Sequence, residues 1–244
     1  MLNYSHAEVP VRSDFAQAHQ RFWDRLARPG TWWRSAERLA IAEEARNAEH
    51  CALCAARRAA LSPHAVDGAH DRVTDLPEPV VDVIHAIVCY APRLTRGWFE
   101  DVLSRGLSDG QYVEIVGTVV ALISIDRFCR GLGLPLHRLP APGEGAPSQY
   151  RPSSAAADEA WLPLVPVHNA ETPEADLWPA GMAANVIRAM SLVPDEVRTL
   201  ADLGAVHYLP GHMVRTPSAS KGALTRPQME LVAGKVTAMH ECFY

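Results

Sequence analysis

The sequence predicts an all-α protein. Seven segments place apolar residues at a spacing near 3.6, the period of an α-helix, and almost no segment alternates as a half-buried strand would. Hydrophobic residues make up 48% of the 244 residues, which is enough for a sizeable buried core. The length allows one large domain or two small ones.

The expected helices cover residues 14–28, 33–50, 78–91, 95–105, 109–132, 194–204 and 226–241. Pro29-Gly30 breaks the pattern between the first two. The long fifth helix ends at "GLGLP", where glycines and a proline follow the last periodic residue.

Two of these helices begin with a capping-box pattern. Ser108 precedes Gln111 by three residues, and Thr225 precedes Gln228 in the same way. In this pattern each side chain bonds the other residue's backbone N–H. Both helix starts are therefore well defined.

Proline marks the middle of the chain as irregular. Nine of the 19 prolines lie between Pro135 and Pro179. A connection of this length commonly joins domains or wraps over a surface. We expect a helical unit over residues 1–136, a connection over 137–176, and a second, incomplete unit over 177–244.

Three helical stretches can be aligned with one another: "LAIAEEARNAEHC", "EIVGTVVALISIDRFC" and "ELVAGKVTAMHEC". Cys51 then falls opposite Cys242, and Glu114 falls opposite Glu230. Internal repetition and shared helical amphipathicity both explain this similarity.

Composition excludes several classes of function. The net charge is −5 and Lys and Arg do not cluster, so no nucleic-acid surface is expected. The longest uncharged apolar run, Ile115–Ile125, is far shorter than the about 20 residues that a membrane helix needs. The start "MLNYSHAEVP" has neither the basic nor the apolar part of a signal peptide. We expect a cytoplasmic protein without membrane partners.

Cysteine usage points to one special pair. Of five cysteines, Cys51 and Cys54 are separated by two residues, while Cys89, Cys129 and Cys242 stand apart. A close pair in a reducing compartment is usually redox-active or metal-binding. Isolated cysteines are more often small buried apolar residues, which is our expectation for Cys129.

The end of the chain resembles a family motif. Glu230, eleven residues and Cys242 are similar to the start of the motif of the alkylhydroperoxidase AhpD and carboxymuconolactone decarboxylase superfamily: Glu, eleven residues, Cys-x-x-Cys, three residues, His. The second cysteine and the histidine would fall beyond Tyr244. The front half has both thiols, but Leu39 replaces the glutamate and Arg58 the histidine.

The resemblance implies an AhpD-like helical bundle and a thiol-dependent peroxidase. Its substrate would be hydrogen peroxide or an organic hydroperoxide, a separate thiol would serve as reductant, and the chain would form a homo-oligomer. No cofactor or metal is expected, and Ala55 after the second cysteine excludes a c-type haem site. The candidate catalytic residues are Cys51, Cys54, Glu44, His50, Glu114, Glu230 and Cys242.

Two roles are expected around the Cys51/Cys54 pair. His50, Arg57 and Arg58 are close enough in sequence to stabilise a thiolate. Glu44 lies two helical turns before Cys51, on the same face, where it can relay protons. The more common interpretation makes Glu43 and Glu44 solvated helix residues.

Other residues keep structural interpretations. His85 sits in the apolar segment "VVDVIHAIVCY", which favours a satisfied core histidine. Glu114 begins an otherwise uncharged apolar helix, so it should be partnered or functional.

Two further functions stay open. A zinc site could combine Cys51 and Cys54 with His64 and His70, giving a catalytically silent protein, although the spacing is short for a Cys2His2 site. A carboxymuconolactone-decarboxylase-type lyase is compatible with the resemblance, but its chemistry does not need the cysteine pair.

The last helix carries an apolar stripe: Met229, Val232, Val236 and Met239. The second unit is short for an independent core. We therefore expect the stripe to pack against the first unit or against another copy of the chain.

Overall fold

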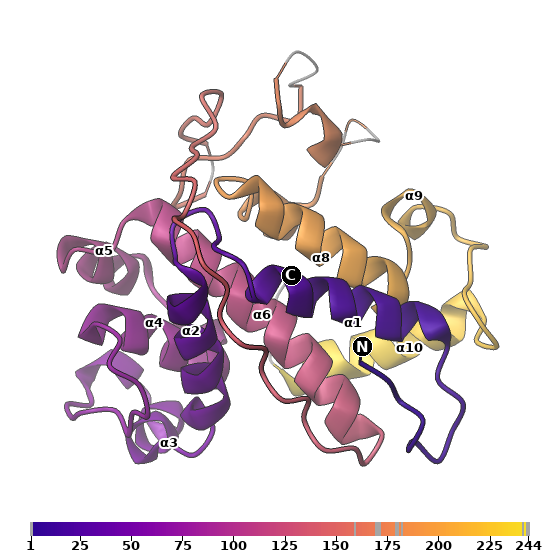
Figure 1. Cartoon of the computed structure of the whole chain (residues 1–244), viewed down its shortest axis with the longest axis horizontal. Coiled ribbons are helices and arrows are strands. Elements are labelled where there is room, and N and C mark those ends of the chain that lie inside the picture. The colour runs from indigo at the N-terminus through magenta and orange to yellow at the C-terminus, as the bar shows by residue number, and fades with distance from the viewer. Residues whose placement is uncertain are drawn as a thin grey trace.

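The computed structural model describes residues 2–158, 160–168, 172–178, 181, 183–240 and 242. These residues are mostly helical and include ten α-helices and no β-strand. Their one β-bridge, between Ala156 and Leu164, is isolated. Figure 1 shows the arrangement of the helices. The predicted all-α fold class is confirmed.

The helices are α1 (Ser13–Leu26), α2 (Ser35–Ala48), α3 (Ala52–Ala59), α4 (Glu78–Tyr90), α5 (Arg96–Ser104), α6 (Asp109–Gly131), α7 (Asn185–Arg188), α8 (Pro194–His207), α9 (Gly211–Val214) and α10 (Arg226–Met239). Short 3-10 turns cover Pro63–Ala65, Ala91–Arg93 and Ala175–Leu177.

All seven predicted helices are present, with ends within about three residues of those expected. Both capping boxes form, at Ser108 with Gln111 and at Thr225 with Gln228. Three short helices, α3, α7 and α9, were not predicted. Apolar periodicity cannot identify helices of one or two turns, because too few residues repeat.

Three helices form the centre of the molecule. α2, α4 and α6 pack on one another, α3 packs on α4, and α8 packs on α6 and α1. Figure 1 places α2–α5 together at one side, with α1, α6 and α8 across the rest. The largest fully buried side chains at this centre include Ile41, Ile84, Ile115 and Leu122.

In the proline-rich connection, the residues that the structure describes before residue 175 form no regular helix, as expected. It runs against α1, where Trp23 Nε1 donates a hydrogen bond of 2.9 Å to the carbonyl of Arg138. Later residues of the connection, including Leu162, join the same apolar core as the first 136 residues. The division into two related units stays a prediction.

A buried ion triad joins α2, α6 and α8. Arg38 lies 3.3 Å from Glu114 and 3.5 Å from Glu196, and all three side chains are almost fully buried. Glu114 also accepts a hydrogen bond of 2.6 Å from the backbone N–H of Trp32. The carboxylate of Glu114, in the second turn of α6, is thus partnered, one of the two outcomes expected from the sequence.

α10 lies at the surface with its apolar stripe uncovered within this chain. Val232, Val236 and Met239 are 58%, 49% and 70% exposed, and Met229 is half-buried. The stripe therefore does not pack into the first unit, which was one of the two expected outcomes. Packing against another copy stays a prediction.

Among the residues that the structure describes, no helix is long and apolar enough to cross a lipid bilayer.

Candidate thiol and histidine centre

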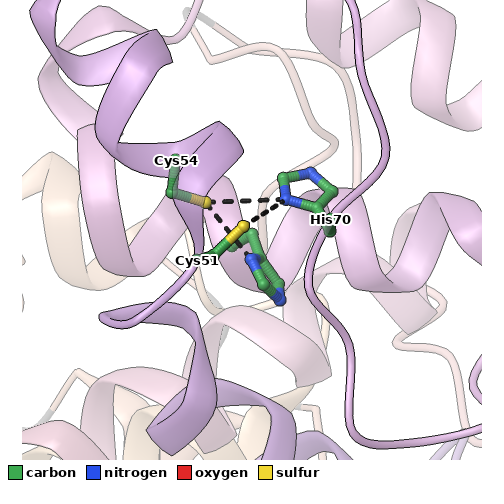
Figure 2. A group of neighbouring side chains, drawn as sticks. Cys51, Cys54 and His70 are labelled. Carbon is green, nitrogen blue, oxygen red and sulfur yellow. Dashed lines mark hydrogen bonds between the residues drawn. The ribbon is translucent and has the colours of Figure 1, made fainter.

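Four side chains from separate parts of the chain meet beside α3. The sulfurs of Cys51 and Cys54 and one ring nitrogen each of His70 and His85 all lie within 4.8 Å of one another. Figure 2 shows the two sulfurs converging on the ring of His70. Three of the four residues are buried, and His70 is half-buried. Both cysteines are free thiols.

The start of α3 positions the two thiols. Cys51 is the N-cap residue, with extended backbone angles, and Cys54 lies in the first helical turn. The backbone N–H of Ala52 donates a hydrogen bond of 2.7 Å to the carboxylate of Asp71, which caps the helix from a separate loop. This geometry places both sulfurs on the inner side of the first turn.

His85 reaches the thiols from α4. Its Nδ1 lies 3.2 Å from the sulfur of Cys54, and its Nε2 lies 3.0 Å from a carboxylate oxygen of Glu44 on α2. Because the carboxylate accepts a hydrogen bond from Nε2–H, Nδ1 presents a lone pair to the thiol. A buried chain of contacts therefore leads from Glu44 through His85 to Cys54.

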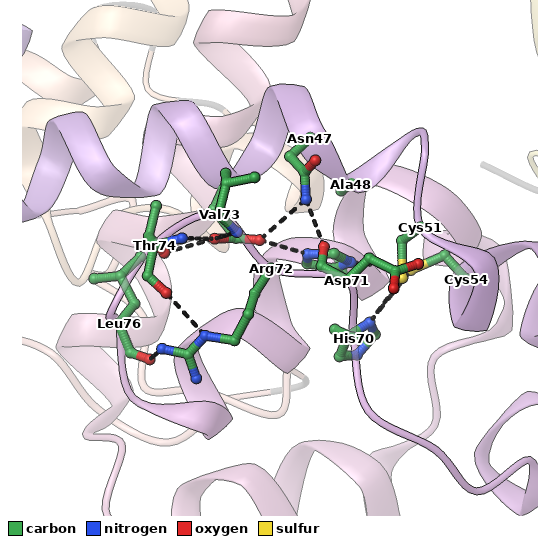
Figure 3. A network of polar contacts seen from close by, with 12 residues as sticks. Asn47, Ala48, Cys51, Cys54, His70, Asp71, Arg72, Val73, Thr74 and Leu76 are labelled. Carbon is green, nitrogen blue, oxygen red and sulfur yellow. Dashed lines mark hydrogen bonds and ion pairs between the residues drawn. The ribbon is translucent and has the colours of Figure 1, made fainter.

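Glu44 is held by several donors. One oxygen accepts hydrogen bonds from the backbone N–H of Thr74 at 3.0 Å, its hydroxyl at 2.5 Å, and the backbone N–H of Val73 at 3.2 Å. Figure 3 shows this network beside the two cysteines. The interpretation of Glu44 as a solvated residue is wrong, because α4 and the loop after His70 cover it. Glu43 is exposed, as expected.

His70 has a matching arrangement. Its Nδ1 lies 3.5 Å from each of the two sulfurs, and its Nε2 lies 2.9 Å from the carboxylate of Asp82. Arg57 lies 3.3 Å from the same Nε2 and 3.4 Å from Asp82. The guanidinium thus contacts the outer side of His70, while Arg58 is exposed.

The pKa values of the two thiols are shifted in opposite directions. Burial opposes ionisation of Cys51, but hydrogen bonds from the backbone N–H of Cys54 and from His70 outweigh it, and the pKa of Cys51 is lowered. The neighbouring Cys89 and burial both raise the pKa of Cys54. The N-cap thiol is the easier of the two to ionise.

The pKa values of the two histidines and of Glu44 also differ from those of the free side chains. Burial lowers the pKa of His85, although Glu44 opposes the shift. For His70 burial is outweighed by Asp82, which raises its pKa. Hydrogen bonds from His85 and Thr74 overcome the burial of Glu44 and lower its pKa. The carboxylates of Glu44 and Asp82 are therefore suited to orient His85 and His70, respectively, by charge.

Of the residues predicted from the sequence, the structure brings Cys51, Cys54 and Glu44 together. His50 is exposed beside them, and Glu114 belongs to the ion triad. Glu230 is on the surface with Arg226 and Tyr208. Cys242 is exposed and lines a separate, mostly apolar cavity with Trp161 and Met190.

Two residues of the centre, His85 and Asp82, were not predicted as functional from the sequence. His85 is fully buried, as expected of a core histidine, but it also contacts a thiol. An acid and a histidine three residues apart in an otherwise apolar helix were the available signal. His64, the other suggested zinc ligand, instead stacks on Trp98 with ring centres 5.7 Å apart.

The centre can carry out two kinds of chemistry. A pair of close thiols with a neighbouring base can be oxidised to a disulfide and reduced again. Two thiolates and two imidazole nitrogens can also bind a soft or borderline metal ion.

Comparisons with protein-family models, with curated proteins and with solved structures give no match to this chain. The resemblance to the AhpD and carboxymuconolactone decarboxylase superfamily therefore stays a prediction.

Proposed function

We propose that this protein is a thiol-dependent, peroxidase-like oxidoreductase that reduces hydrogen peroxide or organic hydroperoxides through Cys51 and Cys54. One observation carries the proposal: the thiol pair lies next to a buried base, His85, that is oriented by Glu44. A nucleophile, a base and a group that orients the base are the parts of an activated thiol site.

In the first step the sulfur of Cys51 attacks one peroxide oxygen. The O–O bond breaks, Cys51 becomes a sulfenic acid, and the alcohol or water leaves with the proton that Cys51 gives up. His70, with Nδ1 3.5 Å from this sulfur, is placed to pass that proton on. Cys51 is oxidised by two electrons and the peroxide is reduced by two.

In the second step Cys54 attacks the sulfenic sulfur. Its proton moves to Nδ1 of His85, 3.2 Å away, and from there to the departing hydroxide, which leaves as water. An S–S bond forms between Cys51 and Cys54. The two sulfurs start within 4.8 Å of each other on one helical turn, so a change of side-chain rotamer can close the bond.

A dithiol completes the cycle. It reduces the Cys51–Cys54 disulfide to two thiols and becomes a disulfide itself, so electrons and protons balance over one turnover. Both cysteine residues are only 2% exposed. This burial favours hydrogen peroxide over bulky hydroperoxides and a reductant that can open the start of α3.

The test starts from reduced protein freed of metal by a chelator. One equivalent of hydrogen peroxide is added, and free thiols are located by mass spectrometry. We expect two thiols to be lost, both in the peptide that contains Cys51 and Cys54. Dithiothreitol should then restore them and support continuous peroxide consumption.

Two variants make the test specific. Cys51→Ser should abolish peroxide consumption, whereas Cys242→Ser, which changes an exposed cysteine outside the centre, should leave it intact. Unchanged thiols in the wild type, or equal oxidation in Cys51→Ser, would show that the pair is not a redox centre.

A further inference from the structure

We propose that the reduced centre is also a zinc site in which Cys51, Cys54, His70 and His85 coordinate one Zn²⁺ tetrahedrally. We further infer that the bound ion prevents the two thiols from reacting with peroxide. This second inference rests on the proposed function. The zinc pattern in the sequence paired the cysteines with His64 and His70, whereas the structure brings His70 and His85 to the two sulfurs.

The spacing of the four donor atoms fits such an ion. Zn²⁺ binds cysteine sulfur at about 2.3 Å and histidine nitrogen at about 2.0–2.1 Å, so tetrahedral ligands lie roughly 3.4–3.8 Å from one another. The three sulfur–nitrogen distances that define the centre are 3.5, 3.5 and 3.2 Å. Small rotations of side chains are enough to reach the coordination geometry.

The outer contacts support the same inference. Zinc-bound histidines usually donate their other N–H to a carboxylate, which fixes the ring and its tautomer. Both histidines here do so: His70 to Asp82 at 2.9 Å and His85 to Glu44 at 3.0 Å. In each ring Nδ1 is left to face the sulfurs. Two independent carboxylate–histidine pairs therefore point at the same two sulfurs.

Burial and charge point to a closed site. The two thiolates that would ligate Zn²⁺ balance its two positive charges, so the ion and its thiolates together add no net charge to the core. Four protein ligands leave no position for a water molecule, which is typical of structural rather than catalytic zinc. We infer that the ion stabilises the junction of α2, α3 and α4.

Zinc binding and disulfide formation exclude each other. Each sulfur uses its lone pair either for the metal or for the S–S bond, and oxidation of the pair removes two of the four ligands. The zinc-loaded protein should therefore lose its thiols to peroxide more slowly than the metal-free protein.

The experiment titrates the reduced, metal-free full chain with ZnCl₂ in competition with a chromophoric chelator. We expect one Zn²⁺ per chain. Titration with Co²⁺ should give the intense visible bands of tetrahedral cobalt together with sulfur-to-metal charge transfer, a signature that a mixed surface site lacks.

The matched variants are His70→Ala and His64→Ala, two histidines of the same loop region. His70→Ala should weaken zinc binding at least 100-fold, and His64→Ala should leave it unchanged. Asp82→Asn keeps all four ligands and should weaken binding about 10- to 100-fold, as other losses of an outer partner do. Asp82→Asn also tests the zinc site if a variant that lacks one of the four ligands does not fold.

The outcomes separate the two proposals. Reduced protein that binds no zinc, or binds it equally in His70→Ala, overturns the metal site even if peroxide still oxidises the thiols. Zinc binding without any peroxide-dependent loss of thiols supports the metal site and rejects the peroxidase function. Equal rates of thiol loss with and without zinc overturn the protective role of the ion.

Discussion

Nε2 of His85 lies 3.0 Å from a carboxylate oxygen of Glu44, and both side chains are fully buried. A histidine oriented in this way presents Nδ1 to Cys54 in a fixed tautomer. The pair joins α2 to α4, and it also orients the base that contacts Cys54 in α3.

Glu44→Gln should slow the peroxide-dependent loss of thiols by roughly 100-fold, a common size for general acid–base catalysis. The amide can still accept the hydrogen bond from His85, but it no longer stabilises a protonated ring. The rate is measured by quenching and counting free thiols in metal-free protein.

Glu43→Gln is the matched control for this change, because Glu43 is the exposed neighbour on the same helix. It should keep the wild-type rate. Thermal unfolding of both variants checks that they are folded. Equal rates in the wild type and Glu44→Gln would show that the carboxylate does not assist the thiols.

Gly30→Ala should destabilise the fold by about 3 kcal/mol or more, as other severe overpacking does. A Cβ at this position would lie 1.7 Å from a carboxylate oxygen of Glu114, which Arg38 holds in the buried triad. The free energy of unfolding is measured by urea denaturation.

Gly204→Ala is the comparison, because a Cβ there meets nothing within 4 Å in helix α8. It should be neutral or slightly stabilising, by about 1 kcal/mol at most. A similar stability of Gly30→Ala and Gly204→Ala would mean that the loop before α2 moves away from Glu114 at little cost.

Stability should carry a pH-dependent component from Glu196. Burial raises the pKa of Glu196 to about 7, although Arg38 opposes the shift. The unfolded chain releases this proton near pH 4.3, so between roughly pH 4.3 and 7 the folded state holds a proton that the unfolded state has lost. This component therefore stabilises the protein below that window and disappears as the pH rises through it.

Glu196→Gln should remove this component, which is worth at most about 4 kcal/mol. The measurement is the free energy of unfolding at several values between pH 4.5 and 7.5, taken as the difference between wild type and variant. A flat profile for Glu196→Gln would place the pKa of Glu196 near its ordinary value.

The exposed stripe of α10 should form an interface between copies of the chain. Val232 and Val236 are both about half exposed on a helix without buried residues. Sedimentation equilibrium should show a dimer or larger assembly, and Val232→Asp or Val236→Asp should dissociate it, because a charge in an apolar interface lacks a partner.

Ala238→Asp places the same charge away from the stripe on the same helix and should leave the assembly intact. A folded monomer at all concentrations, unchanged by either valine substitution, would show that α10 is an ordinary surface helix.

Sequence alone determined the longer helices, because their signals are local. Apolar spacing located seven helices, and Ser108 with Gln111 fixed the start of the longest one within a single turn. The Cys51/Cys54 pair was equally visible, since both thiols lie on one turn of the chain. So was the abnormal position of Glu114 in an uncharged helix, although its partner was not.

Tertiary structure alone decided what surrounds the thiols. Glu44, His70 and His85 lie on α2, on a loop and on α4, and only the packing of those elements brings them to Cys51 and Cys54. Apolar periodicity predicts that one face of a helix is buried, but not which other element packs against that face. It therefore could not distinguish an ordinary core histidine from His85, which contacts a sulfur. The same limit explains why the sequence suggested His64 for the centre: proximity along the chain is no measure of distance once a loop folds back, and His64 turns instead onto Trp98.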